Sequence, residues 1–119
     1  DMVSSQLIKK SVQRLRPCRT EASVQVNTRV YCGSGYSFTS SHATNHFAIA
    51  VFWIFVLGKY IKWIKLPLII WASLISFAQV FVGVHFPTDV LVGCVVGCLV
   101  GYFWAALYMR YYENNLENA

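Results

Sequence analysis

The segment LPLIIWASLISFAQVFVGV, residues 66–84, runs for 19 residues without an Asp, Glu, Lys or Arg side chain. A second segment of this kind, VLVGCVVGCLVGYFWAALYM, covers residues 90–109. A helix needs about 20 predominantly apolar residues to cross the hydrocarbon core of a bilayer. A third, shorter apolar run extends from about residue 43 to residue 58 and has polar or basic residues at both ends. The three runs predict helices that cross a membrane.

The composition of the chain agrees with this interpretation. The 119 residues are enough for one domain, and 56% of them are hydrophobic. Only 13% are charged, whereas a soluble domain usually has about 25%. The alternative, three buried helices in a soluble bundle, leaves too few polar positions to face water. We therefore predict an all-α, multi-pass transmembrane helix bundle with about three full spans and an N-terminal helix.

We expect a single domain over residues 1–119. Its first helix is amphipathic and ends at Pro17, because a proline disfavours helical backbone in the residue before it. The chain begins in what reads as the middle of this helix, so we expect the N-terminus to be truncated. The predicted elements are helices at about 2–16, 42–58, 66–84 and 88–111, and an outer loop at 17–41.

The net charge of +5 comes from two groups of cations. One group lies in the N-terminal quarter, and the other, Lys59, Lys62 and Lys65, shares a side with Arg110 if the helices alternate. Short cytoplasmic loops are enriched in Lys and Arg, which places the C-terminus in the cytoplasm and the 17–41 loop outside. The N-terminal cations break this rule, which indicates that they bind an anion. No aromatic and basic pattern of a nucleic-acid-binding domain is present.

Two of the cysteines lie in the predicted outer loop. Cys18 and Cys32 would then face an oxidising compartment, so a disulfide between them could close the loop. Cys94 and Cys98 lie four residues apart in an apolar helix, and we expect them to be buried thiols.

Polar residues gather at the predicted outer ends of the apolar segments. Lys9 and Arg16 are seven residues apart, so on a helix they share a face and can converge on one anion. Ser40, Ser41 and His42 precede a helix, whose first backbone N–H groups can bind an anion. Simpler roles are also open. Basic residues beside a membrane contact lipid headgroups, and Ser40 or Ser41 can cap the helix.

His85 and Asp89 are four residues apart around a turn that contains Pro87. A carboxylate that accepts a hydrogen bond from one imidazole nitrogen fixes the tautomer and leaves the other nitrogen nucleophilic. The alternative is a capping Asp89 and a His85 at the membrane interface. The presence of all three groups in one chain favours chemistry at a phosphate without a metal ion, because no cluster of metal ligands is evident in the sequence.

These three blocks resemble those of the type 2 phosphatidic acid phosphatase superfamily, the lipid phosphate phosphatases related to vanadium haloperoxidases. The family pattern reads Lys-x6-Arg-Pro, Pro-Ser-Gly-His and Ser-Arg-x5-His-x3-Asp. The corresponding residues here are Lys9-x6-Arg16-Pro17, Thr39-Ser40-Ser41-His42 and Ala78-Gln79-x5-His85-x3-Asp89. The resemblance covers nearly the whole chain. It implies a membrane-embedded helical phosphatase, and the family usually has further membrane helices ahead of the first block.

The resemblance also implies a role for each matching residue. His85 attacks phosphorus and carries a phosphohistidine, Asp89 orients His85, and His42 acts as general acid. The phosphoryl oxygens are bound by residues of all three blocks: Lys9, Arg16, Ser40, the backbone N–H of Ser41, and Gln79. No metal and no other cofactor is implied, and phosphate or vanadate is the expected ligand.

One departure from the pattern concerns charge. Gln79 stands where the family has an arginine, and Gln donates hydrogen bonds without a charge. A charge-assisted hydrogen bond contributes about 1.5–3 kcal/mol, so its loss could slow the reaction. A catalytically weakened or inactive relative that only binds an anionic lipid headgroup therefore stays open.

The resemblance implies hydrolysis of a phosphate or diphosphate from a membrane lipid. The stretch GVHFPTDV, residues 83–90, is typical of the bacterial branch of the family. It favours an undecaprenyl-diphosphate phosphatase of the bacterial cytoplasmic membrane with its active site on the outer, periplasmic side. Phosphatidylglycerophosphate and a lipid A phosphate are the competing substrates.

Overall fold

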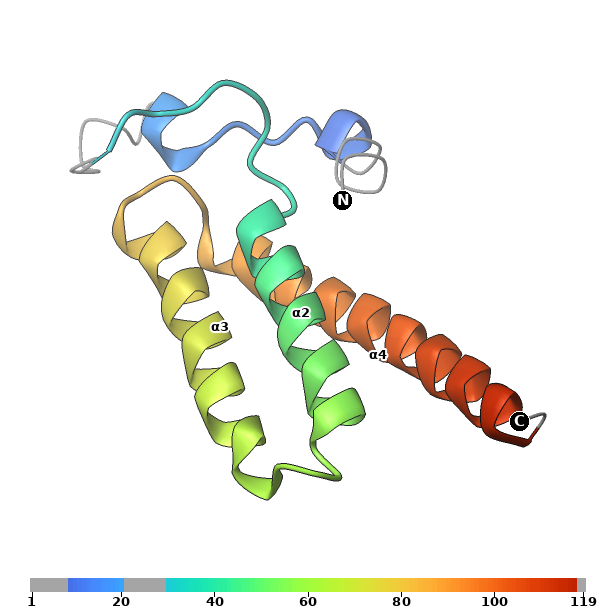
Figure 1. Ribbon diagram of the computed structural model, residues 1–119. Coiled ribbons are helices and arrows are strands. Elements are labelled where there is room, and N and C mark those ends of the chain that lie inside the picture. Colours follow the sequence, from blue (N-terminus) through green and yellow to red (C-terminus); the bar gives the residue numbers. More distant parts are fainter. Residues whose placement is uncertain (1–8, 21–29, 118–119) are drawn as a thin grey trace.

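All regular elements in the described part of the chain are helical. The computed structural model describes residues 9–20 and 30–117. Three long helices form the body: α2 (Ser41–Leu57), α3 (Lys65–Phe81) and α4 (Pro87–Glu117). Helices α2 and α3 lie side by side and α4 crosses them obliquely, while residues 9–20 and 30–40 lie across the end where α2 and α4 begin (Figure 1). The predicted all-α fold is confirmed.

The helix boundaries follow local sequence signals. Helix α2 begins after Ser40, whose side-chain oxygen accepts a hydrogen bond from the backbone N–H three residues later at 3.4 Å. Helix α3 ends at Phe81, a few residues before the predicted end, and Gly83 then turns the chain with a left-handed φ of 77°. Helix α4 begins at Pro87, which suits a first helical position, and extends past the predicted end to Glu117. Two short 3-10 helices, η1 (Pro17–Arg19) and η3 (Lys62–Ile64), lie in the connections.

The predicted helix at 2–16 is wrong at its C-terminal end, and its first residues lie outside the described part of the chain. Among the described residues of this segment, helical backbone covers residues 9–12. Gln13 adopts a left-handed φ of 48°, which breaks the helix. Arg16 is extended, with φ −72° and ψ 152°, because Pro17 follows it.

This early end changes how the first block is presented. The seven-residue spacing predicted that Lys9 and Arg16 share a helix face. This prediction is wrong, because the helix ends before Arg16. The extended segment instead lies against the loop before α2, where the Arg14 carbonyl accepts a hydrogen bond from the Ser37 N–H at 2.7 Å. A contact between distant parts of the chain has thus replaced helical hydrogen bonds.

Helices α2 and α4 approach closely along a glycine seam, which consists of three glycines of α4 at intervals of four: Gly93, Gly97 and Gly101. A Cβ atom on Gly97 would lie 2.4 Å from the Thr44 carbonyl oxygen, and one on Gly101 would lie 2.4 Å from that of Ala48. No side chain fits at such distances. Small residues at this spacing let two helix backbones touch, as in membrane helix pairs.

The glycine seam reaches the polar end of the bundle. A Cβ atom on Gly93 would lie 2.8 Å from the Ser40 carbonyl oxygen. One turn earlier, the Asp89 carbonyl accepts a hydrogen bond from the Ser40 N–H at 3.1 Å. The seam therefore fixes the first turn of α2 against the first turn of α4, where the second and third sequence blocks lie.

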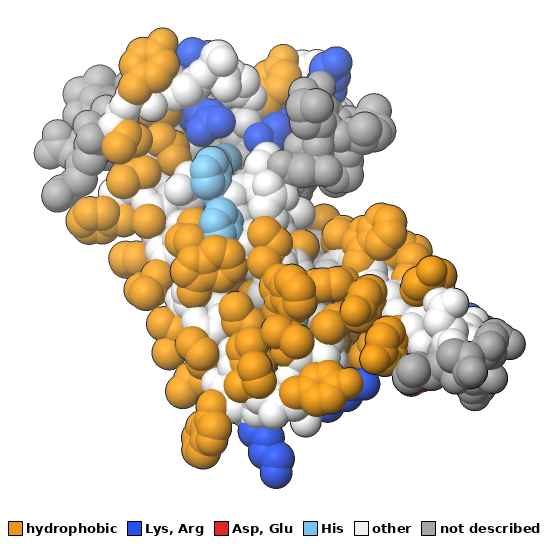
Figure 2. Space-filling model, viewed as in Figure 1, with side chains coloured by type: hydrophobic (Ala, Val, Ile, Leu, Met, Phe, Trp, Pro, Cys, Tyr) orange, Lys and Arg blue, Asp and Glu red, His pale blue; other side chains and the backbone are white. Residues whose placement is uncertain are grey.

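Two of the three predicted spans meet the length expected for crossing a membrane. They are Lys62–Phe81, with 20 residues, and Pro87–Asn115, with 29 residues; α2 is apolar but has only 17. Only 11% and 28% of the most apolar windows of the two longer segments are buried inside the protein, so their side chains need an apolar solvent. Figure 2 shows hydrophobic side chains over the helices, with Lys and Arg side chains at either end.

Candidate active site

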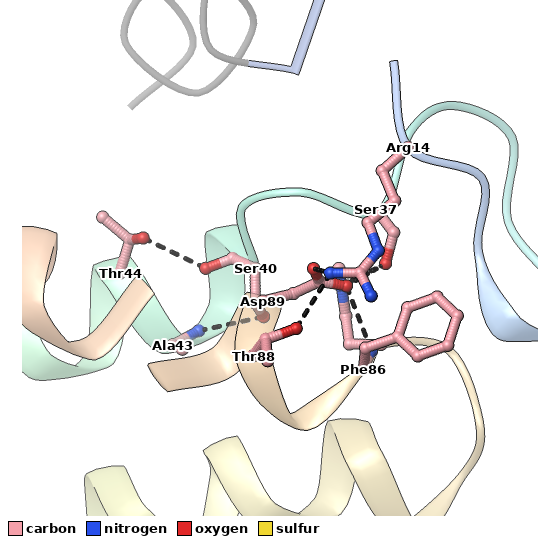
Figure 3. Close-up of polar contacts among 9 residues, drawn as sticks. Arg14, Ser37, Ser40, Ala43, Thr44, Phe86, Thr88 and Asp89 are labelled. Atoms are coloured by element: carbon pink, nitrogen blue, oxygen red, sulfur yellow. Dashed lines mark hydrogen bonds and ion pairs between the residues drawn. The ribbon is translucent and has the colours of Figure 1, made fainter. Parts of the chain in front are cut away.

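Asp89 is the centre of a buried hydrogen-bond network at the start of α4 (Figure 3). Its side chain is fully buried. Oδ1 accepts a hydrogen bond from Nη1 of Arg14 at 2.9 Å. Oδ2 accepts one from the Phe86 backbone N–H at 3.0 Å and another from the Ser37 hydroxyl. These three donors compensate the carboxylate for the water it has lost.

Arg14 ties the N-terminal segment to the beginning of α4. Besides the ion pair with Asp89, its Nη1 donates to Oγ1 of Thr88 at 2.8 Å. Its guanidinium lies over the Phe86 ring, 4.1 Å from the ring centre. Arg14 lies at a variable position of the first block, between Lys9 and Arg16, and nothing in its spacing marks it as a site residue. Its partners are more than seventy residues away in the chain.

His85 lies in the turn between α3 and α4, and its side chain is only 3% exposed. Its Nδ1 atom is 3.9 Å from Oδ2 of Asp89, too far for a direct hydrogen bond. The Ser37 hydroxyl oxygen contacts both groups and lies 3.4 Å from Nδ1. The backbone N–H of His85 donates to the Gln79 carbonyl at 3.2 Å, which holds the turn. The predicted His–Asp pair is thus adjacent, with Ser37 linking its members.

The surroundings of His85 keep its imidazole neutral near pH 7. Burial lowers the pKa of His85 from 6.5 to about 4, and the positive charges of Arg16 and Lys9 lower it as well. The negative charge of Asp89 and a backbone hydrogen bond with Ser37 act in the opposite direction but do not prevail. A neutral imidazole retains a lone pair with which it can attack an electrophile.

Lys9 and Arg16 lie close enough to this network to interact with it electrostatically. Burial is the largest cause that lowers the pKa of each, and the charge of Asp89 raises both. The Arg16 guanidinium packs against Gly33, where its Cζ atom would lie 3.9 Å from an added Cβ. Its Nε atom is buried and has no hydrogen-bond partner among the described residues. A buried cationic donor of this kind fits a phosphate oxygen.

The second block lies at the first turn of α2. Ser40 uses its oxygen to cap the helix and its N–H to bond Asp89, so both groups are engaged within the fold. Ser41 and His42 follow in the first turn, whose N–H groups have no acceptor inside the helix. The His42 ring is exposed and stacks on that of His46, with ring centres 6.3 Å apart. In Figure 2 histidine side chains appear between the cations and the hydrophobic surface.

The third block approaches the site mainly through its turn. Gln79 lies in the last turn of α3, and its carbonyl accepts hydrogen bonds from the N–H groups of both Val84 and His85.

Ser37 is a site residue that the sequence blocks do not contain, and only its place three residues before Ser40 could have drawn attention to it. Within residues 9–20 and 30–117, no group of three or more His, Cys, Asp or Glu side chains could hold a metal ion.

The predicted disulfide is confirmed. Cys18 and Cys32 are bonded, with their Cα atoms 6.1 Å apart. The bond joins the segment that carries Arg16 to the loop that leads to Ser37. It therefore constrains the two chain segments that cover the ends of α2 and α4. Cys94 and Cys98 are free thiols of α4 and are only partly buried.

Comparison with known proteins agrees with this arrangement. The sequence matches the PAP2 superfamily over residues 1–115. The chain belongs to this superfamily. The resemblance stated from the three blocks, that to the type 2 phosphatidic acid phosphatases, is thereby confirmed.

Several named proteins are similar to this PAP2 chain. A lipid A 4'-phosphatase of Bacteroides thetaiotaomicron is 30% identical over 87% of this chain and 47% of its own length. One of Porphyromonas gingivalis is 32% identical over 92% of this chain and 46% of its own. An undecaprenyl-diphosphatase of Bacillus subtilis is 35% identical over 66% of this chain and 39% of its own. The chain thus spans about half the length of the curated relatives it matches, or less.

A solved structure supports the fold. The crystal structure of a transmembrane PAP2-type phosphatidylglycerolphosphate phosphatase from Bacillus subtilis matches with a TM-score of 0.73. The match covers 92% of this chain and 54% of the other, at 24% identity. Together with the exposed apolar surfaces of α3 and α4, the family identifies an integral membrane protein.

Proposed function

We propose that this PAP2 protein hydrolyses a phosphate or diphosphate from a membrane lipid, with His85 as the nucleophile. One observation carries the proposal: a neutral, buried His85 lies within electrostatic reach of Lys9 and Arg16, and Arg16 has a buried donor that none of the described residues satisfies. A nucleophile beside cations, one of them with an unsatisfied donor, is the arrangement that transfer of a phosphoryl group requires.

In the proposed reaction, Nε2 of His85 attacks phosphorus and the lipid oxygen leaves, which produces a covalent phosphohistidine. His42 donates a proton to the leaving oxygen and later helps to activate water, which releases inorganic phosphate. Asp89 stabilises the positive charge on His85. The growing charge on the phosphoryl oxygens is balanced by donors from all three blocks: Lys9, Arg16, the hydroxyl proton of Ser40, the N–H of Ser41, and Gln79.

The site is proposed to lie on the outer, periplasmic side of a bacterial cytoplasmic membrane. The connection between α2 and α3 carries Lys59 and Lys62, and Lys65 begins α3, at the end of these helices opposite the site. Short loops rich in Lys and Arg stay in the cytoplasm. The half-buried cations of the site are then explained by their phosphate ligand rather than by topology.

Undecaprenyl diphosphate remains our proposed substrate, on the typical stretch of residues 83–90. The 4'-phosphate of lipid A is the second candidate, because the relatives with that name match more of this chain than the undecaprenyl-diphosphatase does. Both are lipids with a phosphate at the membrane surface. The alternative function, suggested by Gln79 in place of the family arginine, is a catalytically weakened or inactive relative that binds an anionic lipid headgroup.

The test is release of inorganic phosphate by the full-length protein in detergent. Undecaprenyl diphosphate, lipid A and phosphatidylglycerophosphate are offered separately, each with and without EDTA. We expect release from at least one of them, and no release by the His85→Ala variant. Activity that survives in His85→Ala, or that EDTA abolishes, would contradict the proposed mechanism. Binding of these lipids without any phosphate release would favour the inactive relative.

A further inference from the structure

We propose that Ser37 is a positioning residue that connects Asp89 to His85 and determines which imidazole nitrogen attacks phosphorus. This inference rests on the proposed function. The Ser37 side chain is fully buried, and its hydroxyl oxygen contacts Oδ2 of Asp89 and Nδ1 of His85. The direct distance between those two atoms is 3.9 Å, so the serine supplies the connection that the carboxylate cannot make itself.

The polarity of this connection follows from the number of protons available. A serine hydroxyl donates one hydrogen bond, and an ionised carboxylate only accepts. The Ser37 proton is therefore directed to Asp89. The serine oxygen can then only accept from His85, which requires that Nδ1 carries the imidazole proton. Nε2 is left with the lone pair, so Nε2 is the attacking atom.

The carboxylate is held at this distance by its other partners. Arg14 binds its Oδ1 atom and the Phe86 N–H binds its Oδ2 atom, so Asp89 cannot move toward His85 without breaking one of them. Ser37 is held as well, because its own N–H donates to the Arg14 carbonyl at 2.7 Å. Arg14 thus positions both the carboxylate and the serine that connects it to the nucleophile.

The hydrogen-bond connection from Asp89 through Ser37 to His85 acts both when the phosphohistidine forms and when water hydrolyses it. When the N–P bond forms and the lipid P–O bond breaks, His85 keeps its Nδ1 proton and becomes a cationic phosphoimidazole. Asp89 stabilises that charge through the Ser37 hydroxyl. When water forms a new O–P bond and the N–P bond breaks, the imidazole returns to its neutral form with the same tautomer. No net proton passes through Ser37.

The first test measures the tautomer directly and does not depend on activity. Nitrogen NMR of the full-length protein, labelled with 15N-histidine in detergent micelles at pH 7, identifies the His85 signals by their loss in His85→Ala. We expect protonated Nδ1 in the wild type. In Ser37→Ala we expect the Nε2-protonated form, which free imidazole side chains prefer. Ser34→Ala, an exposed serine of the same loop, should leave the tautomer unchanged. Protonated Nε2 in the wild type, or no change in Ser37→Ala, would overturn the inference.

The second test separates positioning from a purely structural role. Ser37→Ala should lower kcat by about ten- to a hundredfold and leave KM within about twofold, because the lost contact matters mainly in the transition state. In an Asp89→Asn background the same change should cost less than about threefold, since the carboxylate it serves is gone. Equal losses in both backgrounds would contradict the connection through Asp89.

Two controls keep the outcomes distinct. If Ser37→Ala does not fold, Ser37→Cys replaces it, because a thiol has a similar shape but is a weak donor. It should change the tautomer and kcat in the same direction. Wild-type protein that hydrolyses none of the lipid phosphates would contradict the proposed function, while the NMR measurement would still decide whether Ser37 sets the tautomer of His85.

Discussion

Both ends of the helix bundle are rich in cations, but the two ends hold their cations differently. At the site end, Lys9 and Arg16 are partly buried and interact with the fully buried carboxylate of Asp89. At the opposite end the basic side chains are exposed: Lys59, Lys62 and Lys65. Of these, Lys59 lies over the neighbouring Tyr60 ring, 5.0 Å from its centre.

This difference shows that the number of cations at each end does not predict anion binding, because it ignores how well water solvates each cation. A solvated lysine is already satisfied by water and gains little from one more anion. A partly buried arginine with an unpaired donor has lost hydration, and an anion that binds there restores the lost interaction. Phosphate should therefore bind selectively at the site end, although the opposite end is also basic.

The largest expected effect tests this comparison directly. Arg16→Ala should weaken vanadate or phosphate binding by about ten- to a hundredfold, because a charge-assisted, partly buried contact contributes about 1.5–3 kcal/mol. The matched change at the other end, Lys62→Ala, should alter binding less than twofold. Inhibition of lipid phosphate hydrolysis by vanadate gives both values. Similar losses in both variants would mean that the two ends are not functionally different.

The glycine seam holds α2 against α4 next to the site end, and its disruption is the next largest effect. Gly97→Val introduces side-chain atoms where a Cβ alone would lie 2.4 Å from the Thr44 carbonyl oxygen. Overpacking of this kind costs about 1–3 kcal/mol, and here it presses on Thr44, whose N–H and hydroxyl both donate to the Ser40 carbonyl. We expect a lower thermal unfolding midpoint and loss of activity. Val95→Leu is the control, because Val95 is 61% exposed on the same helix. An unchanged midpoint in Gly97→Val would show that the seam is loosely packed.

Much of the site end could be predicted from the sequence. The three blocks identified the family, and apolar length identified the helices. The location of Cys18 and Cys32 in one outer loop pointed to their disulfide, which the structure contains. These inferences succeeded because each depends on local spacing or on a family pattern.

The contacts that organise the site were not predictable in this way. Arg14 and Ser37 meet Asp89 across 75 and 52 residues of sequence. The hydrophobic periodicity of a sequence predicts helices but not contacts between residues so far apart in the chain. The same tertiary contacts explain the error in the first helix, since the backbone of Arg14 bonds to Ser37 instead of continuing the helix. The glycine spacing of four in α4 was a visible signal for close helix packing that the prediction did not use.

A third prediction concerns the pH at which the site end loses its nucleophile. The pKa of His85 is lowered from 6.5 to about 4, so its neutral form persists as pH falls from 7 to 5 and is lost only near pH 4. Because the unfolded chain takes up this proton already near pH 6.5, the folded state also loses stability between about pH 6.5 and pH 4. NMR titration of His85 should report a midpoint near 4, and Arg16→Gln should raise it. A midpoint near 6.5 would mean that His85 is as solvated as an ordinary surface histidine.

The smallest expected effect adds a charge to the site end. Gln79→Arg restores the cation of the family pattern in the last turn of α3, where the Gln79 carbonyl already binds the His85 N–H. Arg14 is another source of charge at the site end, but its Nη1 atom is engaged by Asp89 and Thr88. An arginine at position 79 should therefore be free to bind the phosphoryl group. A charge-assisted hydrogen bond exceeds a neutral one by about 1 kcal/mol, so we expect vanadate affinity and turnover to rise about five- to tenfold.

The control for this prediction is Gln79→Lys, which adds the same charge without the bidentate guanidinium and should give a smaller gain. An equal gain in both variants would indicate that charge alone was missing at the site end. A decrease in Gln79→Arg would mean that Arg14 already occupies the space where the family arginine acts. In that case Arg14, paired with Asp89, would be the substitute for the lost arginine, and the site end would owe its phosphate affinity to a cation at a variable position of the first block.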